Sequence, residues 1–193
     1  MALHLVSVQP NIYVGSILAL TSPVTLESRR VAAVVSLVSG PLPAAYQATL
    51  DRVKTRICHL HVDVEDEENV NILQYIELIN AFIDDTTAAI DSENGPSVLI
   101  HCMAGISRSA TVAIAYLMWK HQLDYETVFK SVKSQRTVIS PNPAFVAQLR
   151  LYEQWQWVIT GNPLYKLWLS DRIPRGSKVP LDVINSRYAK LKL

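Results

Sequence analysis

The residues of this chain that could do chemistry gather in the segment SVLIHCMAGISRSATVAIAYLM, residues 97–118. An apolar run leads into Cys102, five residues separate this cysteine from Arg108, and an apolar helix is predicted over 107–121. A strand–loop–helix turn directs several backbone N–H groups inward, and the positive end of the helix adds to their field. The segment therefore predicts a cradle for an anion. Arg108 closes it, because a planar guanidinium can hold two phosphate oxygens at once.

Cys102 is placed at the start of this cradle. A thiol beside a helix N-terminus and a cation loses its proton readily, so we expect a thiolate at neutral pH. A thiolate behind a bound phosphate can attack in line, which predicts phosphoryl transfer to sulfur followed by hydrolysis. Gly105 permits the tight curvature of the loop. His101 precedes the cysteine in an extended chain, so its side chain should point away and act structurally, by hydrogen bonds that support the thiolate.

A leaving group must be protonated as it departs, so this chemistry needs a carboxylic acid on a second loop. The segment HVDVEDEENV, residues 61–70, offers five candidates: Asp63, Glu65, Asp66, Glu67 and Glu68. Most of them are expected to form a solvated acidic surface that also favours the N-terminus of the helix that follows. The residue types alone leave the choice among the five open.

The elements that must position these residues alternate along the chain. Short β-branched runs predict strands over residues 11–15, 31–38, 57–62 and 97–102. Helical patterns cover residues 41–54, 70–90, 107–121, 124–135 and 143–159, with Asp124 and Asn142 as expected N-caps of the last two. Such alternation requires crossover connections, so we predict an α/β fold with a mostly parallel central sheet flanked by helices.

Composition narrows the class of protein. A formal net charge of +1 and 49% hydrophobic residues give no sign of nucleic acid or membrane as the main ligand. There is no run of about 18 apolar residues and no signal-peptide pattern, so a cytoplasmic or nuclear location and no membrane partner are expected. The two cysteines cannot build a disulfide framework or a four-thiolate zinc site. Cys58 is expected to be a buried residue of its strand.

We expect one catalytic domain over residues 1–161 and a basic C-terminal extension over 162–193, helical at its start and then loosely ordered. Against two aspartates, the extension carries seven cations: Lys166, Arg172, Arg175, Lys178, Arg187, Lys190 and Lys192. A basic run is usually a solvated surface, and direct RNA binding by this one is left open.

The residues HCMAGISRS, 101–109, resemble the His-Cys-x5-Arg-Ser/Thr signature of the cysteine-based protein phosphatases, and the helix containing AYLM resembles their dual-specificity branch. The likeness extends through NIYVGSILAL, 11–20, and QRTVISPNPAFVAQLRLYE, 135–153. It continues into NPLYKLW, 162–168, which resembles the zinc-binding dual-specificity phosphatases that take part in maturation of the large ribosomal subunit. That subfamily carries a cysteine-rich zinc domain after the catalytic one. This chain shows no such cysteines up to Leu193, so it resembles the catalytic part.

The resemblance assigns roles to the site residues. It implies that Cys102 is the nucleophile, that Arg108 binds phosphate, and that Ser109 stabilises the thiolate as it leaves the phosphoenzyme. It implies that His101 and Asn142 support the loop. The phosphate-binding loop is completed by five residues: Met103, Ala104, Gly105, Ile106 and Ser107.

The resemblance also selects an acid. In related phosphatases the acid follows the spacing apolar-x-Asp, which Val64-Glu65-Asp66 reproduces. Asp66 is therefore the expected general acid, and Asp63 is the reserve.

The activity implied is hydrolysis of phosphotyrosine and phosphoserine or phosphothreonine in proteins, through a phosphocysteine and with no cofactor or metal. The loop adds no cation between Cys102 and Arg108, which favours phosphoproteins over phosphoinositides. The alternative is a ribosome-assembly factor, with pre-ribosomal particles as partners, whose phosphatase activity is incidental. An intact site indicates that the chain can hydrolyse phosphate esters, but not that its cellular role depends on this reaction. The sequence therefore leaves this alternative open.

Overall fold

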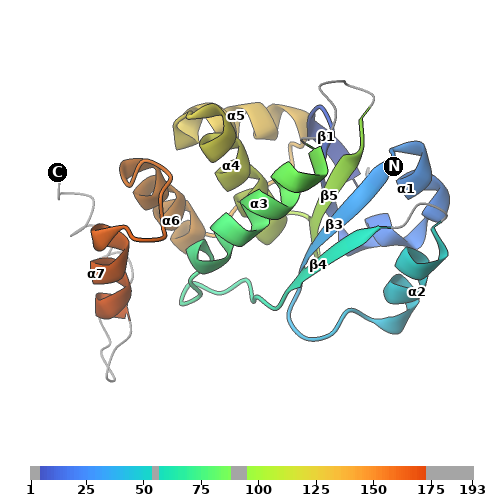
Figure 1. Ribbon diagram of the computed structural model, residues 1–193, viewed down its shortest axis with the longest axis horizontal. Helices are drawn as coiled ribbons and strands as arrows, with labels where there is room; N and C mark the ends of the chain where they lie inside the picture. Colours follow the sequence, from blue (N-terminus) through green and yellow to red (C-terminus); the bar gives the residue numbers. More distant parts are fainter. Residues whose placement is uncertain (1–4, 54–56, 88–94, 173–193) are drawn as a thin grey trace.

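The computed structural model describes residues 5–53, 57–87 and 95–172. One sheet has the strand order β1-β2-β5-β3-β4. The strands are β1 (Leu5–Gln9), β2 (Ile12–Ser16), β3 (Val31–Leu37), β4 (Cys58–Val62) and β5 (Ser97–Cys102). β1 is antiparallel to β2, and the other neighbouring pairs are parallel. The predicted α/β fold with a mostly parallel central sheet is confirmed (Figure 1).

Helices cover both faces of the sheet (Figure 1). The larger layer contains α3 (Ile76–Thr87), α4 (Arg108–His121), α5 (Tyr125–Gln135) and α6 (Pro143–Gln154). The smaller layer contains the 3-10 helix η1 (Ile17–Thr21), α1 (Pro23–Ser28) and α2 (Ala44–Arg52). Because both faces are covered, β5 is buried along its whole length, as is typical of inner parallel strands.

The central helix of the larger layer is α4. Its residues 108–118 are all buried, because it contacts α3, α5 and α6 as well as strands β2 and β5. A helix that is apolar all round is stable only in such an environment. The loop between β5 and α4, residues 103–107, is therefore held between two elements that are themselves fixed by the core.

Several predicted boundaries were close, but β1, α1 and the two 3-10 helices were not predicted. The three short helices have three to six residues, which is less than two turns and too short for a helical period to be recognised. The predicted helix over 143–159 is too long, because Gln156 and Trp157 adopt positive φ angles of 55° and 57°, which a right-handed helix cannot continue through.

The helix predicted over 70–90 begins later than expected. A short 3-10 helix, η2 (Leu73–Tyr75), precedes α3, which starts at Ile76. Residues 88–90 of that prediction, and residue 54 of the predicted helix 41–54, lie outside the described residues. The two predicted N-caps are confirmed: the Asp124 side chain accepts from the N–H of Thr127, and Asn142 from that of Phe145, each at 2.9 Å.

The prediction that Cys58 is buried is wrong. Its side chain is exposed, and both cysteines are free thiols. Cys58 is the first residue of β4, which is an edge strand and pairs only with β3. An edge strand is covered less completely than the inner strands on either face, which leaves this residue in contact with solvent.

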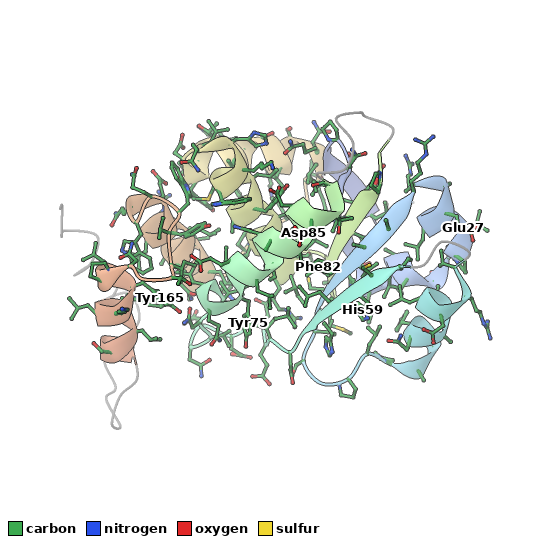
Figure 2. The ribbon with its side chains drawn as sticks, in the orientation of Figure 1. Glu27, His59, Tyr75, Phe82, Asp85 and Tyr165 are labelled. Atoms are coloured by element: carbon green, nitrogen blue, oxygen red, sulfur yellow. The ribbon has the colours of Figure 1, made fainter. Side chains whose placement is uncertain are left out.

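The helix predicted at the start of the C-terminal extension is present as α7 (Pro163–Arg172). Trp168 of α7 is fully buried, and its ring lies 5.8 Å from that of Trp155 and 5.9 Å from that of Tyr165 (Figure 2 labels Tyr165). The Tyr165 hydroxyl accepts a hydrogen bond from Asn71 at 3.1 Å. α7 therefore packs on the same core as α3, α4, α5 and α6, whereas residues 173–193 lie outside the described part.

Replacing Trp168 by alanine tests this docking. We expect Trp168→Ala to lower the free energy of unfolding by about 3–5 kcal/mol, because it empties a buried aromatic site. The matched control is Leu167→Ala on the exposed side of α7, which should cost less than about 1 kcal/mol. Urea denaturation measures both, and equal small losses would mean that α7 does not belong to the core.

Candidate active site

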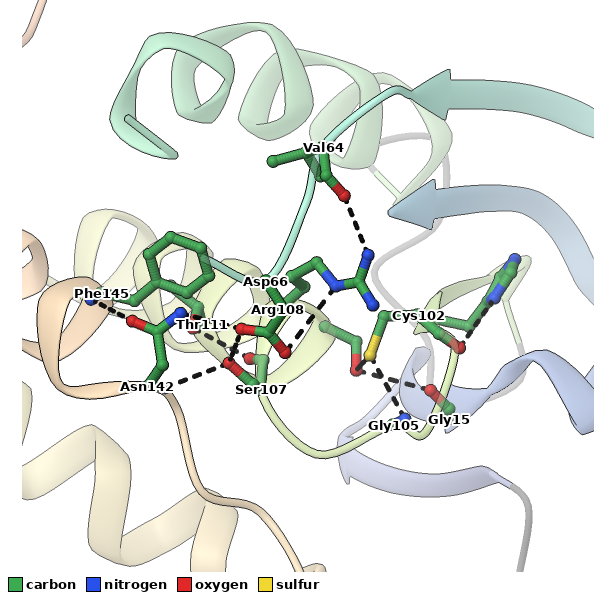
Figure 3. Close-up of polar contacts among 12 residues, drawn as sticks. Gly15, Val64, Asp66, Cys102, Gly105, Ser107, Arg108, Thr111, Asn142 and Phe145 are labelled. Atoms are coloured by element: carbon green, nitrogen blue, oxygen red, sulfur yellow. Dashed lines mark hydrogen bonds and ion pairs between the residues drawn. The ribbon is translucent and has the colours of Figure 1, made fainter. Parts of the chain in front are cut away.

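The loop from Cys102 to Arg108 curves around the sulfur of Cys102 (Figure 3). The side chain of Cys102 is buried at the end of β5. The backbone N–H of Gly105 donates to Sγ at 3.2 Å, and the hydroxyl of Ser109 lies 3.3 Å from Sγ. Both groups lie within hydrogen-bonding distance of the sulfur, where a donor can stabilise negative charge that develops on it.

Gly105 fits this loop only because it has no side chain. Its φ is +71°, in the left-handed region. A Cβ atom here would lie 2.6 Å from the carbonyl carbon and oxygen of Gly15 and 2.7 Å from Nη2 of Arg136. The backbones of β2 and the loop therefore approach at a distance that no other residue type permits.

Arg108 faces the loop with one donor unused. Its Nη1 donates to the carbonyl oxygen of Val64 at 2.9 Å. Its buried Nε finds no hydrogen-bond acceptor among the described residues, and the closest carboxylate oxygen, Oδ2 of Asp66, forms an ion pair with it at 3.8 Å. Buried donors are nearly always paired in folded proteins, so this one is suited to an oxygen of a ligand.

The N-terminus of α4 adds to the same site. No side chain caps this helix, since Ser107 at the N-cap position makes no capping hydrogen bond. The N–H groups of its first turn are therefore not occupied by a capping side chain. With the helix dipole they are suited to an anion beside Arg108, and the anion cradle expected from the sequence stays a prediction.

Asp66 is joined to the end of the loop. Its Oδ1 accepts from the hydroxyl of Ser107 at 2.7 Å and from the side-chain amide of Asn142 at 2.8 Å (Figure 3). Asp63, the reserve acid, instead accepts from the backbone N–H of Gly40 at 3.0 Å. The structure thus brings Asp66 to the loop and directs Asp63 to a neighbouring turn.

Asn142 connects three parts of the site. Besides capping α6 and donating to Asp66, its backbone N–H donates to the hydroxyl of Ser107 at 3.0 Å. The N–H of Ser140 donates to the carbonyl oxygen of Ile106 at 2.9 Å. The segment 136–142 therefore lies against the loop, and the capping and loop-supporting roles predicted for Asn142 are compatible.

His101 is buried beneath the loop and contacts the backbone of Cys102, not its sulfur. Its Nδ1 lies 3.4 Å from the Cys102 carbonyl oxygen, and its Nε2 lies 2.6 Å from the Ser36 hydroxyl. That hydroxyl also lies 2.8 Å from Nε2 of His59, which Figure 2 labels on β4. Burial lowers the pKa of His101 to about 4, so the imidazole is neutral near pH 7.

Sequence reasoning missed one residue that supports the loop directly. Arg136 is buried at the end of α5, and its Nε donates to the carbonyl oxygen of Gly105 at 3.0 Å. Burial lowers the pKa of the Arg136 guanidinium from its ordinary value. No spacing in the sequence marks this arginine, because the fold alone brings the end of α5 under the loop.

The described residues contain neither a membrane-spanning helix nor a cluster of metal-ligating side chains. None of the helices in residues 5–53, 57–87 and 95–172 is long and apolar enough to cross a membrane. Within the same residues, no group of three or more His, Cys, Asp or Glu side chains could hold a metal ion.

Residues 12–155 match the family described as dual specificity phosphatase, catalytic domain. Because this match spans most of the chain, the protein belongs to the family of dual specificity phosphatase catalytic domains.

Individual relatives agree with this assignment. Dual specificity protein phosphatase 1 of Arabidopsis thaliana is 33% identical over 147 residues, covering 76% of this chain and 68% of that protein. Tyrosine-protein phosphatase yvh1 of Schizosaccharomyces pombe is 34% identical over 145 residues, covering 70% of this chain and 42% of that protein. The crystal structure of human DUSP28 superposes with a TM-score of 0.69 at 30% identity, covering 82% of this chain and 98% of that one. For four other curated relatives, the chain spans between 13% and 63% of their length.

Adding one methyl group to Gly105 should disrupt the site. We expect Gly105→Ala to reduce turnover of a phosphate ester by at least about 100-fold, because the Cβ would force the loop away from Gly15 and displace its N–H from Sγ. Gly40→Ala is the matched control, since Gly40 has a φ of +70° but nothing within 4 Å of an added Cβ. It should cost only about 1 kcal/mol of stability and retain turnover. Equal losses of activity in both variants would contradict the steric explanation.

The buried His101 should make stability depend on pH. Its pKa is about 4 in the folded chain against an ordinary value of 6.5, so the unfolded chain takes up a proton first as the pH falls. The stability present above pH 6.5 is therefore lost toward pH 4, by about 2 kcal/mol between about pH 6.5 and about pH 5. Urea denaturation at both pH values should show that His101→Gln loses this dependence and that the exposed control His121→Gln retains it. A His101→Gln variant with the full dependence would contradict the assignment.

Proposed function

We propose that this chain is a protein phosphatase that hydrolyses phosphotyrosine and phosphoserine or phosphothreonine through a phosphocysteine at Cys102. The observation that carries the proposal is the buried Nε–H of Arg108, which has no hydrogen-bond acceptor among the described residues and lies, with the uncapped N-terminus of α4, at the end of the loop that starts at Cys102 (Figure 3). A phosphate ester bound in the loop supplies the missing acceptors. The same position puts the thiolate behind phosphorus, which is the arrangement for in-line attack.

The first chemical step forms the phosphocysteine. The thiolate of Cys102 attacks phosphorus, the bond from phosphorus to the substrate oxygen breaks, and Asp66 gives its proton to that oxygen. Arg108 and the N–H groups of residues 103–107 hold the phosphoryl oxygens. These groups supply the positive charge that stabilises the negatively charged transition state, so the mechanism requires no metal ion.

The second step returns the enzyme to its starting state. Asp66, now a carboxylate, takes a proton from water, and the water oxygen attacks phosphorus while the phosphorus–sulfur bond breaks. The hydroxyl of Ser109, 3.3 Å from Sγ, stabilises the thiolate that leaves. His101 and Asn142 keep the loop in place through the Cys102 carbonyl and the Ser107 hydroxyl.

A role in maturation of the large ribosomal subunit is the second candidate, with pre-ribosomal particles as partners and a cytoplasmic or nuclear location. Its support is the resemblance of residues 162–168 to the zinc-binding subfamily. RNA contact by the basic tail depends mostly on residues 173–193, which lie outside the described part. In cells that lack the protein, a Cys102→Ser copy that restores normal ribosome maturation would favour an assembly role, whereas failure to restore it would favour a role that needs catalysis.

The Cys102→Ser substitution tests the mechanism on para-nitrophenyl phosphate in the presence of a chelator. We expect Cys102→Ser to abolish turnover while the folded protein still binds inorganic phosphate, because the cradle remains and the nucleophile is lost. Normal turnover in this variant would exclude the phosphocysteine. Loss of native activity on adding the chelator would show that a metal ion takes part.

The acid assignment is tested by the dependence on the leaving group. Asp66→Asn should lower the rate by about 10²- to 10⁴-fold for an alkyl phosphate, whose leaving group needs a proton, and much less for para-nitrophenyl phosphate. Asp63→Asn is the matched control and should leave both rates nearly unchanged, since Asp63 is bonded to Gly40. If Asp63→Asn showed the leaving-group pattern instead, the roles of the two residues would be reversed.

A further inference from the structure

We propose that this site selects phosphorylated segments that carry both an apolar and a basic side chain next to the phosphorylated residue. This inference rests on the proposed phosphatase function and specifies its substrate class. It comes from the surface around the loop, which combines a group of exposed apolar side chains with a segment of exposed carboxylates.

Large exposed hydrophobic side chains make up the apolar part of the surface around the loop. Nine large hydrophobic side chains are exposed in the described part of the chain, and four of them belong to segments at the loop. They are Leu18, Met103, Ile106 and Val138, with exposed fractions of 43%, 52%, 38% and 55%. We call these four the apolar rim. Single exposed hydrophobics are ordinary, but a group of them around a reactive pocket indicates a contact surface.

The apolar rim is held in place by the backbone. The N–H of Ile17, next to Leu18, donates to the carbonyl oxygen of Met103 at 3.3 Å. The N–H of Ser140, two residues after Val138, donates to the carbonyl oxygen of Ile106 at 2.9 Å. These bonds join η1 and the segment 136–142 to the phosphate-binding loop. The rim is therefore preorganised, and a substrate that covers it loses little conformational entropy in ordering it.

The acidic part of this surface is the segment 63–68. It contacts the loop through Asp66, which bonds to Ser107 and forms an ion pair with Arg108. The carboxylates of Glu65, Glu67 and Glu68 are exposed. Asp63 and Glu65 line a hollow of about 440 Å³ together with Ser39, Val64, Val70, Asn71, Gln74 and Tyr75. This lining contains two carboxylates and no lysine or arginine, so it is complementary to a basic side chain of a substrate.

The segments around the site offer little to a second negative charge. In the described segments 16–21, 38–43, 63–70, 103–107 and 136–142 the one lysine or arginine is Arg136. Its guanidinium is buried and donates to the Gly105 carbonyl oxygen. Lys133 of α5 reaches the last of these segments, but its Nζ is partly buried and donates to the Ile139 carbonyl oxygen at 2.7 Å. An acidic flank, or a second phosphate close to the first, meets carboxylates or the apolar rim, and repulsion and desolvation both oppose its binding.

Three phosphotyrosine peptides of equal length test the selection. One carries leucine on one side and arginine on the other, one carries glutamate on both sides, and one carries a nearby second phosphate. We expect kcat/KM, measured by phosphate release, to be at least about 10-fold higher for the leucine–arginine peptide than for the other two.

Variants of exposed residues test which side chains cause the expected preference among the peptides. Val138→Ser should lower the ratio of kcat/KM for the leucine–arginine peptide to that for para-nitrophenyl phosphate by about 3- to 10-fold, and Leu78→Ser, exposed on α3, should not. Glu65→Lys should lower the ratio of kcat/KM for the leucine–arginine peptide to that for the peptide with glutamate on both sides. Its control is Asp51→Lys at the end of α2, which should have no effect.

The outcomes separate this inference from the function on which it rests. No turnover of para-nitrophenyl phosphate by the folded chain would overturn the phosphatase function itself. Turnover of that ester with equal rates for the three peptides would overturn the selection alone, as would a preference for the acidic or doubly phosphorylated peptide. Val138→Ser and Glu65→Lys variants with unchanged peptide ratios would exclude the apolar rim and the acidic segment as its cause.

Discussion

The phosphate-binding loop depends on the close contact between the backbones of Gly105 and Gly15. This contact lets the N–H of Gly105 reach the sulfur of Cys102, and Arg136 fixes the other side of the same peptide through its carbonyl oxygen. Because β5 and α4 are buried on both sides of the loop, the loop cannot relax away from this position. The stability of the core is thereby used to hold donors in the orientation that an anion requires.

The site combines groups from elements that are distant in the sequence. Asp66 comes from the segment after β4, Asn142 from the N-terminus of α6 and Arg136 from the end of α5, and each bonds to residues 105–107. Parallel strands explain the convergence, since their carboxyl ends meet at one edge of the sheet and the connecting segments gather there. The same edge carries the apolar rim and the acidic segment, so the recognition of flanking residues and the chemistry at phosphorus that we propose would share one rigid support.

The histidine beneath the loop has a different environment from the groups above it. His101 lies in a hydrogen-bonded row with Ser36 and His59 and stays neutral because burial opposes its charge. A neutral imidazole can donate to the Cys102 carbonyl oxygen while it accepts from Ser36. It therefore fixes the backbone of Cys102 without adding a charge below it, and the positive charge at the loop remains that of Arg108 and the partial charge of the α4 N-terminus.

The sequence by itself determined the α/β class, the loop from Cys102 to Arg108 and the acidic segment. The class follows from the alternation of local strand and helix patterns, and the loop and the acidic segment are each one continuous stretch of residues. A buried strand, a tight turn and an apolar helix follow each other within residues 97–118, and their period and composition are local properties. The tertiary structure decided what local patterns do not contain. It brought Asp66 and not Asp63 to the loop, placed Arg136 and Gly15 against Gly105, and left Cys58 exposed at an edge. These outcomes depend on the order of strands in the sheet and on which segments meet at its edge, and both are fixed only when the whole core packs.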